Sequence, residues 1–356
     1  MARPFVSVLI DTYNHERFIE QAILSALEQD FPASDCEILV VDDGSQDRTS
    51  EIAARFAPQV RLIRKANGGQ ASAFNTGIPQ CQGEIVAFLD GDDWWAAGKL
   101  KQVVAAFSEN PAVGLIGHGV TQAFEDGTRR TELVRDFPRF RIDSAVGARL
   151  FRLRKAFLGT SRMTFRAEIL RRIGPVPESL TIQADEYLFT MGALFSEVLL
   201  LRDSLTFYRL HGQNLFQLSD GSVTSLRRKH AVLVALADSL RRRFAEECVP
   251  EEFGKAVIEA VQTEADTLHL SLDGGTPLDT IRTELRTYRI DHEHISPFRL
   301  TFKLFTLFPA LFLPPKRYMG WKQKLASNYL YRKIRRWLIP HRHHPHIDRT
   351  GDWSQR

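Results

Sequence analysis

The sequence predicts an α/β fold with a central sheet, and two observations support this prediction. Short apolar runs that suit buried strands alternate with segments whose apolar residues recur at helical spacing. Three of these runs, residues 6–10, 37–41 and 84–89, end in polar residues. Open parallel sheets bind their ligands in the crevice beyond the carboxyl ends of the strands. We therefore expect the three strand ends to form one binding site.

The first two predicted strands are each followed by a polar turn and a helix. Residues 6–10 lead into Asp11-Thr12-Tyr13-Asn14, and residues 37–41 lead into residues 42–49, a segment rich in Asp, Gly and Ser. Such polar clusters favour helix starts. The apolar residues that define the two helices are Phe18, Ile19, Ala22, Ile23 and Leu27 in the first and Ile52, Ala53 and Phe56 in the second.

The third predicted strand is followed by three carboxylates, in the run Asp90-Gly91-Asp92-Asp93. Carboxylates that lie close together repel and raise one another's pKa unless a cation lies between them. Oxygen ligands favour a hard ion, Mg²⁺ or Mn²⁺, and such ions usually share their coordination shell with substrate phosphates. The run therefore predicts a metal–diphosphate site. The alternative is a solvated acidic turn without a ligand.

Four motifs resemble, in their order and spacing, the signatures of the family 2 glycosyltransferases. They are Ser-Val-Leu-Ile-Asp-Thr-Tyr-Asn at residues 7–14, Val-Val-Asp-Asp-Gly-Ser-Gln-Asp-Arg-Thr at 40–49, Asn67-Gly68-Gly69-Gln70 through Asn75-Thr76-Gly77, and Phe-Leu-Asp-Gly-Asp-Asp at 88–93. The resemblance predicts a catalytic domain over residues 1–215. It implies a GT-A fold with a mixed central sheet flanked by helices, a nucleotide-sugar donor, a divalent metal and inversion at the anomeric carbon.

The same resemblance implies which residues bind the donor. They are Thr12, Tyr13, Asn14, Asp42, Asn67, Gly68, Gly69, Asp90 and Arg209. Tyr13 would lie against the base, and Asp42 would hydrogen-bond the base or the ribose. Gly68 and Gly69 would let the backbone approach the donor, because glycine lacks a Cβ.

Asp90 and Asp92 look like the family's Asp-x-Asp pair, with Asp90 at the ribose and metal and Asp92 at the metal between the two phosphates. A Lewis-acid cation at this point stabilises the charge that develops on the leaving nucleoside diphosphate. Two positions depart from the family pattern. Asp11 stands where proline is usual, and Phe74 stands where a basic residue is frequent.

Residues 181–189 resemble the family's acidic motif at the head of a helix, and they contain Asp185 and Glu186. Inversion by direct displacement requires a general base for the acceptor hydroxyl, and a carboxylate is the usual solution. This chain has the two acids in the order Asp-Glu, whereas the family mostly has Glu-Asp, so both remain candidates. We favour Asp185, because the shorter acid is the family's usual base. Alternatively, both acids only interact with the helix dipole.

Residues 207–214 resemble the family's Tyr-Arg-x-His segment. The resemblance implies that His211 completes the metal shell or contacts the diphosphate, with Arg209 nearby. A structural role for this histidine is the alternative. Trp94 and Trp95 are either platforms for a sugar ring or part of the packed strand exit.

The charge of the chain is unevenly distributed. The 356 residues carry a net charge of +4, but residues 296–356 hold thirteen Lys and Arg against two Asp, which gives +11 and leaves −7 for the rest. Such asymmetry marks a segment as an interaction surface. The apolar residues between these cations are Phe298, Leu300, Phe302, Leu304, Phe305, Leu307, Phe308, Leu311, Phe312 and Leu313.

We predict that this basic tail lies at the interface of an anionic membrane. Its charge-poor part, residues 304–313, is too short to span a bilayer, because a spanning helix needs about 20 residues. The alternative is a helical appendage that packs on the protein's own core. Nucleic acid is not an expected partner, since no recognition motif is present.

The remaining features concern organisation and location. Residues 216–295 show helical spacing over 226–244 and 252–272 but no legible chemistry, so acceptor binding, dimer packing and scaffolding all remain open. Cys36, Cys81 and Cys248 have no metal-ligand spacing and suggest reduced thiols. Residues 1–4 lead directly into the first strand, so we expect no signal peptide and a cytoplasmic protein at the inner face of the membrane.

These predictions combine into a metal-dependent inverting glycosyltransferase of hexosyltransferase type. It would move a sugar from a nucleotide-diphosphate donor to a saccharide or lipid-linked acceptor in surface polysaccharide or glycolipid synthesis. A sugar nucleotidyltransferase is less favoured, because a glycine-rich basic loop is expected after its first strand, where this chain has Thr12-Tyr13-Asn14. A catalytically silent nucleotide-sugar-binding scaffold is less favoured because Asp90, Asp92 and Asp185 or Glu186 are all present.

Overall fold

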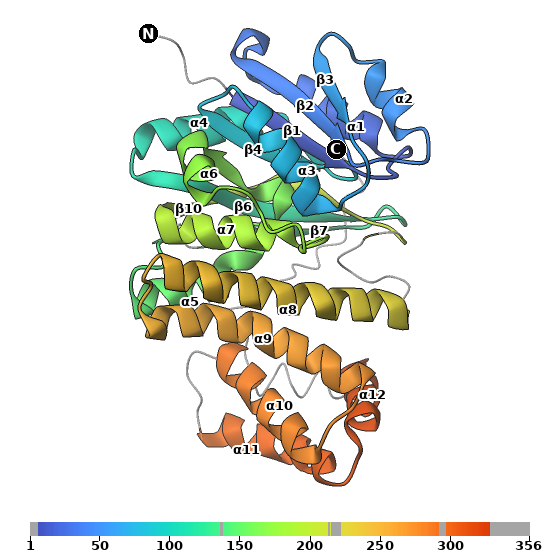
Figure 1. The fold of residues 1–356 in the computed structure, drawn as a ribbon, viewed down its shortest axis with the longest axis vertical. Coiled ribbons are helices and arrows are strands. Elements are labelled where there is room, and N and C mark those ends of the chain that lie inside the picture. The colour runs from blue at the N-terminus through green and yellow to red at the C-terminus, as the bar shows by residue number, and fades with distance from the viewer. Residues whose placement is uncertain (1–5, 136–137, 213, 215–221, 292–296, 328–356) are drawn as a thin grey trace, which may run out of the picture. The chain divides into compact units, whose positions relative to one another are not determined.

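The computed structural model describes residues 6–135, 138–212, 214, 222–291 and 297–327. These residues fall into two compact units, one within residues 1–219 and the other within residues 220–344 (Figure 1). The described parts of residues 216–295 and of residues 296–356 both belong to the second unit. A separate catalytic domain over residues 1–215 remains a prediction.

The described residues of the first unit form one ten-stranded mixed sheet. Its main path runs in the order β3-β2-β1-β4-β9-β6-β10-β5, with β7 paired to β6 and β8 paired to β10. The strands are β1 (Val6–Thr12), β2 (Cys36–Asp42), β3 (Val60–Arg64), β4 (Ile85–Asp90), β5 (Trp94–Trp95), β6 (Val113–Phe124), β7 (Arg129–Glu132), β8 (Arg139–Phe140), β9 (Thr164–Arg166) and β10 (Glu197–Leu210). The mixed sheet agrees with the predicted fold class.

Helices flank this sheet (Figure 1). They are α1 (Ile19–Leu27), α2 (Thr49–Ala54), α3 (Gln70–Gly77), α4 (Lys99–Glu109), α5 (Ala145–Arg154), α6 (Ala167–Ile173) and α7 (Ala184–Phe195), with the 3₁₀ turns η1 (Ala33–Asp35), η2 (Ile78–Gln80), η3 (Lys155–Phe157) and η4 (Thr160–Arg162). The predicted apolar face of α1 is confirmed, because Ile19, Ala22 and Ile23 are fully buried in the main hydrophobic core.

Parallel pairing brings the carboxyl ends of β1, β2 and β4 to the same edge of the sheet. In the register of the strands, Thr12 lies opposite Asp42 and Asp11 lies opposite Asp90. The apolar residues of these strands are almost completely buried, which explains their near-continuous hydrophobic runs. The prediction that these strand ends lie together is therefore confirmed.

The described residues of the second unit are helical. The elements are α8 (Val223–Glu246), α9 (Glu251–Leu272), α10 (Pro277–Asp291), α11 (Pro297–Leu307), η5 (Phe308–Leu311) and α12 (Pro315–Ser327). The helices predicted over 226–244 and 252–272 are confirmed as α8 and α9, which lie side by side (Figure 1). Within the described ranges, no helix combines the length and the apolar character needed to span a bilayer.

A buried carboxylate joins three helices of the second unit. Glu284 of α10 is 1% exposed and accepts from Lys303 Nζ of α11 at 2.6 Å and from Lys322 Nζ of α12. Burial alone would raise the pKa of Glu284, but the two ammonium groups outweigh burial and lower it. The ionised carboxylate therefore stabilises the fold above its unfolded-state pKa, and this contribution is lost as the pH falls through the lower folded-state pKa.

We predict that Glu284→Gln lowers the free energy of unfolding of the second unit by about 3 kcal/mol at pH 7, because it leaves two lysines around a neutral group. At acidic pH, below the lowered folded-state pKa of Glu284, the difference from wild type should shrink, since wild-type Glu284 also becomes protonated. Urea unfolding at both pH values measures the effect. Glu252→Gln, at an exposed site on α9, serves as the control. An equal loss at both pH values would contradict the assigned role of the ion pairs.

Candidate active site

The turns that follow β1 and β2 are bound to each other. The N–H of Asn14, which has a left-handed φ of 56°, donates to Ser45 Oγ at 2.9 Å. Asn14 Oδ1 accepts from the N–H of Gln46 at 2.8 Å. Thr12 is buried, whereas Tyr13 is 37% exposed. The residues predicted to line the nucleoside pocket thus lie at the joined ends of two strands, and Tyr13 presents its ring to solvent.

Asp42 ends β2 as a buried carboxylate. Its Oδ1 accepts from the N–H of Ser45 at 2.8 Å, and its Oδ2 accepts from the Ser50 hydroxyl. Arg64 Nε lies 3.8 Å from the same Oδ2. Both oxygens of Asp42 thus have partners within the chain. A further hydrogen bond to a base or ribose stays a prediction.

Asp43 binds the loop that was predicted to approach the donor. Its carboxylate accepts from the N–H of Gly68 at 3.0 Å, from the N–H of Gly69 at 2.6 Å and from Lys65 Nζ at 2.7 Å. Asn67 Nδ2 donates to the carbonyl oxygen of Asp43 at 3.0 Å. These contacts order residues 67–69 from inside the protein. A contact between this loop and the donor stays a prediction.

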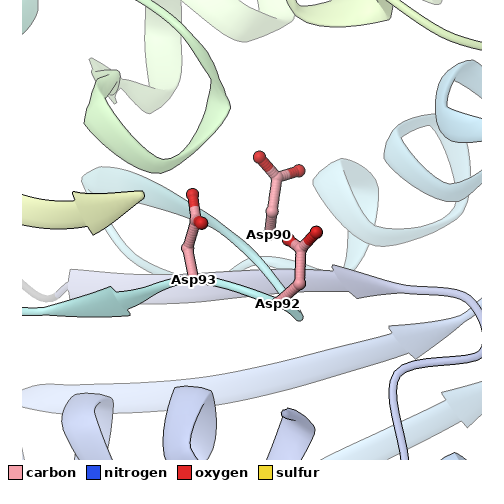
Figure 2. Close-up of side chains that lie close together, drawn as sticks. All are labelled: Asp90, Asp92 and Asp93. Carbon is pink, nitrogen blue, oxygen red and sulfur yellow. The ribbon is translucent and has the colours of Figure 1, made fainter. Parts of the chain in front are cut away.

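Three carboxylates gather at the turn that follows β4. Figure 2 shows the side chains of Asp90, the last residue of β4, and of Asp92 and Asp93 in the turn, all pointing to the same side. One oxygen from each of the three lies within 4.8 Å of the others. Asp93 is 1% exposed and accepts from the N–H of Arg209 at 2.9 Å. Burial raises the pKa of Asp90 and of Asp93, and the neighbouring carboxylates raise it further.

A fourth carboxylate, Asp11, joins this cluster from the end of β1. Burial, followed by the charge of Asp92, raises the pKa of Asp11 to about 8. Its Oδ1 is buried and has no hydrogen-bond partner among the described residues. Crowded carboxylate oxygens, one of them without a partner, fit a hard divalent cation. The sequence showed Asp11 as a departure from the family pattern but gave no role for it.

Two histidines flank Asp92. His211 Nε2 lies 3.0 Å and His15 Nε2 lies 3.8 Å from Asp92 Oδ2. Burial alone would raise the pKa of Asp92, but these two rings outweigh burial and lower it. The predicted proximity of His211 to Asp92 is thus present in the structure. His15 was not predicted to lie at the site, although it follows the polar residues at the end of β1 that were.

Arg209 is anchored around the acidic turn rather than directed freely into solvent. Its Nε donates to the carbonyl oxygen of Asp92 at 2.9 Å. The guanidinium lies over the rings of Trp94 and Phe18, at 4.5 and 4.7 Å from their centroids. Trp94 also stacks on Phe207, with ring centroids 5.0 Å apart. Trp94 therefore belongs to the packed exit of the strand.

Asp185 and Glu186, in the first turn of α7, face different partners. Glu186 is buried and forms an ion pair with Lys155. Asp185 Oδ2 accepts from the N–H of Thr160 at 3.1 Å, and burial followed by the charge of Glu186 raises its pKa. The charge of Asp185 also acts on Asp11 and Asp90. Asp185 is thus linked to the acidic cluster, whereas Glu186 is paired with Lys155.

The site also contains residues whose role no sequence motif indicated. Ser161 Oγ donates to Asp90 Oδ2 at 3.3 Å and accepts from the N–H of Asp90 at 3.0 Å. Thr160 and Ser161 occupy η4, a short turn without a recognisable motif. Gln70 contacts Asp90, Thr160 and the start of α7. In the sequence, Gln70 stood out only as the last residue of the motif Asn67-Gly68-Gly69-Gln70, and no role was predicted for it.

Comparison with known sequences supports the resemblance. Residues 7–174 match the family model described as glycosyl transferase family 2. An uncharacterised glycosyltransferase of Nostoc sp. is 34% identical over 227 residues, which cover 62% of this chain and 69% of the relative. The glycosyltransferase AglE of Haloferax volcanii is 33% identical over 186 residues, which cover 51% of this chain and 59% of the relative.

Comparison with solved structures supports the fold. TarS residues 1–349 of S. aureus, in complex with UDP-GlcNAc, align with a TM-score of 0.52 and 22% identity over 81% of this chain and 88% of TarS. The mannosyltransferase PcManGT of Pyrobaculum calidifontis, in complex with GDP-Man and Mn²⁺, aligns with a TM-score of 0.54 and 20% identity over 94% of this chain and 87% of PcManGT. At these identities the likeness concerns the fold.

Proposed function

The chain belongs to glycosyltransferase family 2 and has a GT-A type of fold, and from this we propose that it is a metal-dependent, inverting hexosyltransferase. The observation that carries this proposal is the arrangement around Asp92. This carboxylate lies between His15 and His211 and belongs to the acidic cluster that η4 connects to Asp185, because Thr160 of this turn donates to Asp185 and Ser161 donates to Asp90. Donor chemistry and acceptor chemistry thus share one edge of the sheet.

We propose a nucleotide-diphosphate sugar as the donor. TarS and PcManGT were solved with UDP-GlcNAc and GDP-Man, which supports this class of donor for the present chain. The exposed ring of Tyr13 is available to stack on a base, and Asn14 fixes the turn that carries it. A sugar nucleotidyltransferase or a silent scaffold would not require a carboxylate such as Asp185 to be connected to the acidic cluster through η4, so both are less favoured.

Asp90, Asp92 and His211 would hold the divalent cation, Mg²⁺ or Mn²⁺. When bound, the cation stabilises the negative charge that develops on the leaving nucleoside diphosphate. Arg209 and Asp93 position the turn, because the N–H of Arg209 donates to Asp93 and its side chain donates to the carbonyl oxygen of Asp92. The residues around the site therefore keep the ligand oxygens together against their mutual repulsion.

Asp185 is the proposed general base. Its carboxylate is oriented by the N–H of Thr160 and has a raised pKa, which suits proton abstraction from an acceptor hydroxyl. Glu186 is instead neutralised by Lys155 and is proposed to anchor α7. We propose a saccharide or lipid-linked acceptor in surface polysaccharide or glycolipid synthesis.

We further propose that the second unit associates peripherally with an anionic membrane. Six large apolar residues of α11, η5 and the turn that follows are exposed: Leu300, Leu304, Phe305, Phe308, Leu311 and Phe312. Phe305 is 77% and Phe312 is 72% exposed. Exposed apolar side chains gathered on one short segment suggest an interaction site, and the nearby Lys316 and Arg317 are exposed cations.

The same segment also packs on its own unit. Leu307, Ala310 and Tyr318 are buried in an apolar cluster with Leu270 and Met319. The alternative of an appendage that packs on the protein's own core thus holds for Leu307, Ala310 and Tyr318. The six exposed apolar residues remain available to a membrane. The side chains of Phe298 and Phe302, and all of residues 328–356, lie outside the described part.

We predict that Asp92→Asn lowers turnover at least about 10²-fold, because the leaving diphosphate loses its charge stabilisation. Release of nucleoside diphosphate from UDP-, GDP- and dTDP-sugars with Mn²⁺ measures turnover, and calorimetry measures Mn²⁺-dependent nucleotide binding. Circular dichroism should remain unchanged. Glu125→Gln, an exposed carboxylate on the β6–β7 hairpin, is the matched control. Near wild-type turnover by Asp92→Asn would remove the basis for the metal site.

We predict that Asp185→Asn lowers kcat by about 10² to 10⁴ while nucleotide affinity is retained, because only proton abstraction is lost. Glu186→Gln should lower the melting temperature, since it breaks the ion pair with Lys155. Its kcat should stay closer to wild type than that of Asp185→Asn. Parallel kinetics and thermal melts of both variants separate these effects. A larger kcat loss in Glu186→Gln than in Asp185→Asn would reverse the assignment.

We predict that the full chain sediments with anionic vesicles, and that high salt weakens this binding without abolishing it. Each basic group near the surface contributes about 1 kcal/mol, which salt screens, whereas apolar burial is not screened. Combined Phe305→Ser, Phe308→Ser and Phe312→Ser should remove the salt-resistant part. Val146→Ser, an exposed apolar residue of the first unit, is the control. No sedimentation of the full chain, or no effect of the triple variant, would reject the membrane proposal.

A further inference from the structure

Backbone hydrogen bonds join the start of α3 to the segment that leads into α7. The N–H of Gln70 donates to the carbonyl oxygen of Thr181 at 3.0 Å, and the N–H of Ala71 donates to that of Leu180 at 3.3 Å. Gly69 precedes them with a φ of +83°, and a Cβ on it would come within 2.6 Å of Thr181 Cα. The backbone at the start of α3 therefore packs directly on the segment that leads into α7.

The side chain of Gln70 then caps α7. The first N–H groups of a helix have no partner within the helix and need one from elsewhere. Gln183, at the N-cap, has a left-handed φ of 56° and makes no side-chain capping bond. Gln70 Oε1 accepts from the N–H of Ala184, the first residue of α7, at 3.0 Å. A side chain of α3 thus supplies the cap that α7 lacks.

This bond fixes the direction of the Gln70 amide. A backbone N–H can only donate, so the oxygen of the amide must face Ala184 and its NH₂ group must face the other way. On that side, Gln70 Nε2 lies 3.1 Å from Thr160 Oγ1 and 3.5 Å from Asp90 Oδ1. The contact with Thr160 is the firmer of the two. One amide thus connects α7 with the acidic cluster.

The turn η4 closes the connection. The N–H of Thr160 donates to Asp185 Oδ2 at 3.1 Å, and Ser161 Oγ donates to Asp90 Oδ2 at 3.3 Å. The carbonyl oxygen of Ser161 accepts from Lys99 Nζ at 2.7 Å and from Trp95 Nε1 at 3.1 Å, which anchors η4 in the protein. The two carboxylates are therefore held by one continuous hydrogen-bonded bridge.

We propose that Gln70 is a positioning residue that sets the orientation of Asp185 relative to Asp90, and thereby aligns the acceptor base with the donor and metal carboxylates. This inference rests on the proposed function. Gln70 itself carries no proton in the reaction. It acts by capping the helix that carries the base and by holding η4, which contacts both carboxylates.

Gln70→Leu should lower the rate of nucleoside diphosphate release from UDP-GlcNAc or GDP-Man with Mn²⁺ by about 10- to 100-fold. Mn²⁺-dependent binding of UDP or GDP should stay within about threefold of wild type, because Asp92 and His211 are untouched and Asp90 keeps its hydrogen bonds with Ser161. Hydrogen exchange of the amides of residues 184–186 should accelerate by about tenfold, since the cap is lost.

Asn75→Leu is the matched control, because Asn75 is an amide on the same helix that joins α3 to Val176 without contacting either carboxylate. It should lower the melting temperature and leave turnover within about threefold of wild type. Gln70→Met, which keeps the length of the side chain but neither its acceptor for Ala184 nor its donor for Thr160, should also lose turnover, and it replaces Gln70→Leu if that variant does not fold.

Wild-type turnover in both Gln70 variants, or an equal loss of turnover in Gln70→Leu and Asn75→Leu, would overturn the positioning role. If the wild-type chain releases no nucleoside diphosphate from any donor, the proposed function fails. Hydrogen exchange then still tests the cap on which this inference depends, since unchanged exchange at residues 184–186 in Gln70→Leu would show that Gln70 does not hold the start of α7.

Discussion

Mutual repulsion among the carboxylates at the ends of β1 and β4 is the constraint around which the first unit is organised. Parallel pairing places Asp11 opposite Asp90, and the turn after β4 adds Asp92 and Asp93. Burial makes this crowding costly, as the raised pKa of Asp11 and Asp90 shows. A fold can keep such a group only if neighbouring contacts hold it and a cation or proton compensates its charge.

Those neighbouring contacts come from distant parts of the chain. His15 and His211 flank Asp92 from the turns after β1 and β10, and Ser161 holds Asp90 from η4. Lys99 is completely buried, and burial lowers its pKa, yet its Nζ donates to the carbonyl oxygen of Ser161. The carboxylates are therefore kept in place by hydrogen bonds from surrounding elements, so that their oxygens are arranged within the fold itself.

The second unit also buries a carboxylate, but it compensates the negative charge with its own lysines. Its buried acid, Glu284, is compensated within the protein by Lys303 and Lys322, so it needs no ligand. Its apolar residues are divided between the two sides of α11 and η5. Leu307 and Ala310 are buried, whereas Phe305 and Phe308 are exposed. A helix and turn that remain apolar on the outside are typical of a surface that contacts something else.

The strands and the acidic cluster were predictable from the sequence, because buried parallel strands require continuous apolar runs and their polar ends must share one edge of the sheet. The sequence left Asp185 and Glu186 as alternatives and gave no role to His15, Gln70 or Ser161. Only the tertiary structure shows which partners each of these side chains contacts. Adjacent helical residues point about 100° apart, so one acid of α7 faces Lys155 and the other faces η4. Contacts of this kind join residues far apart in the chain, and no local pattern of residue types encodes them.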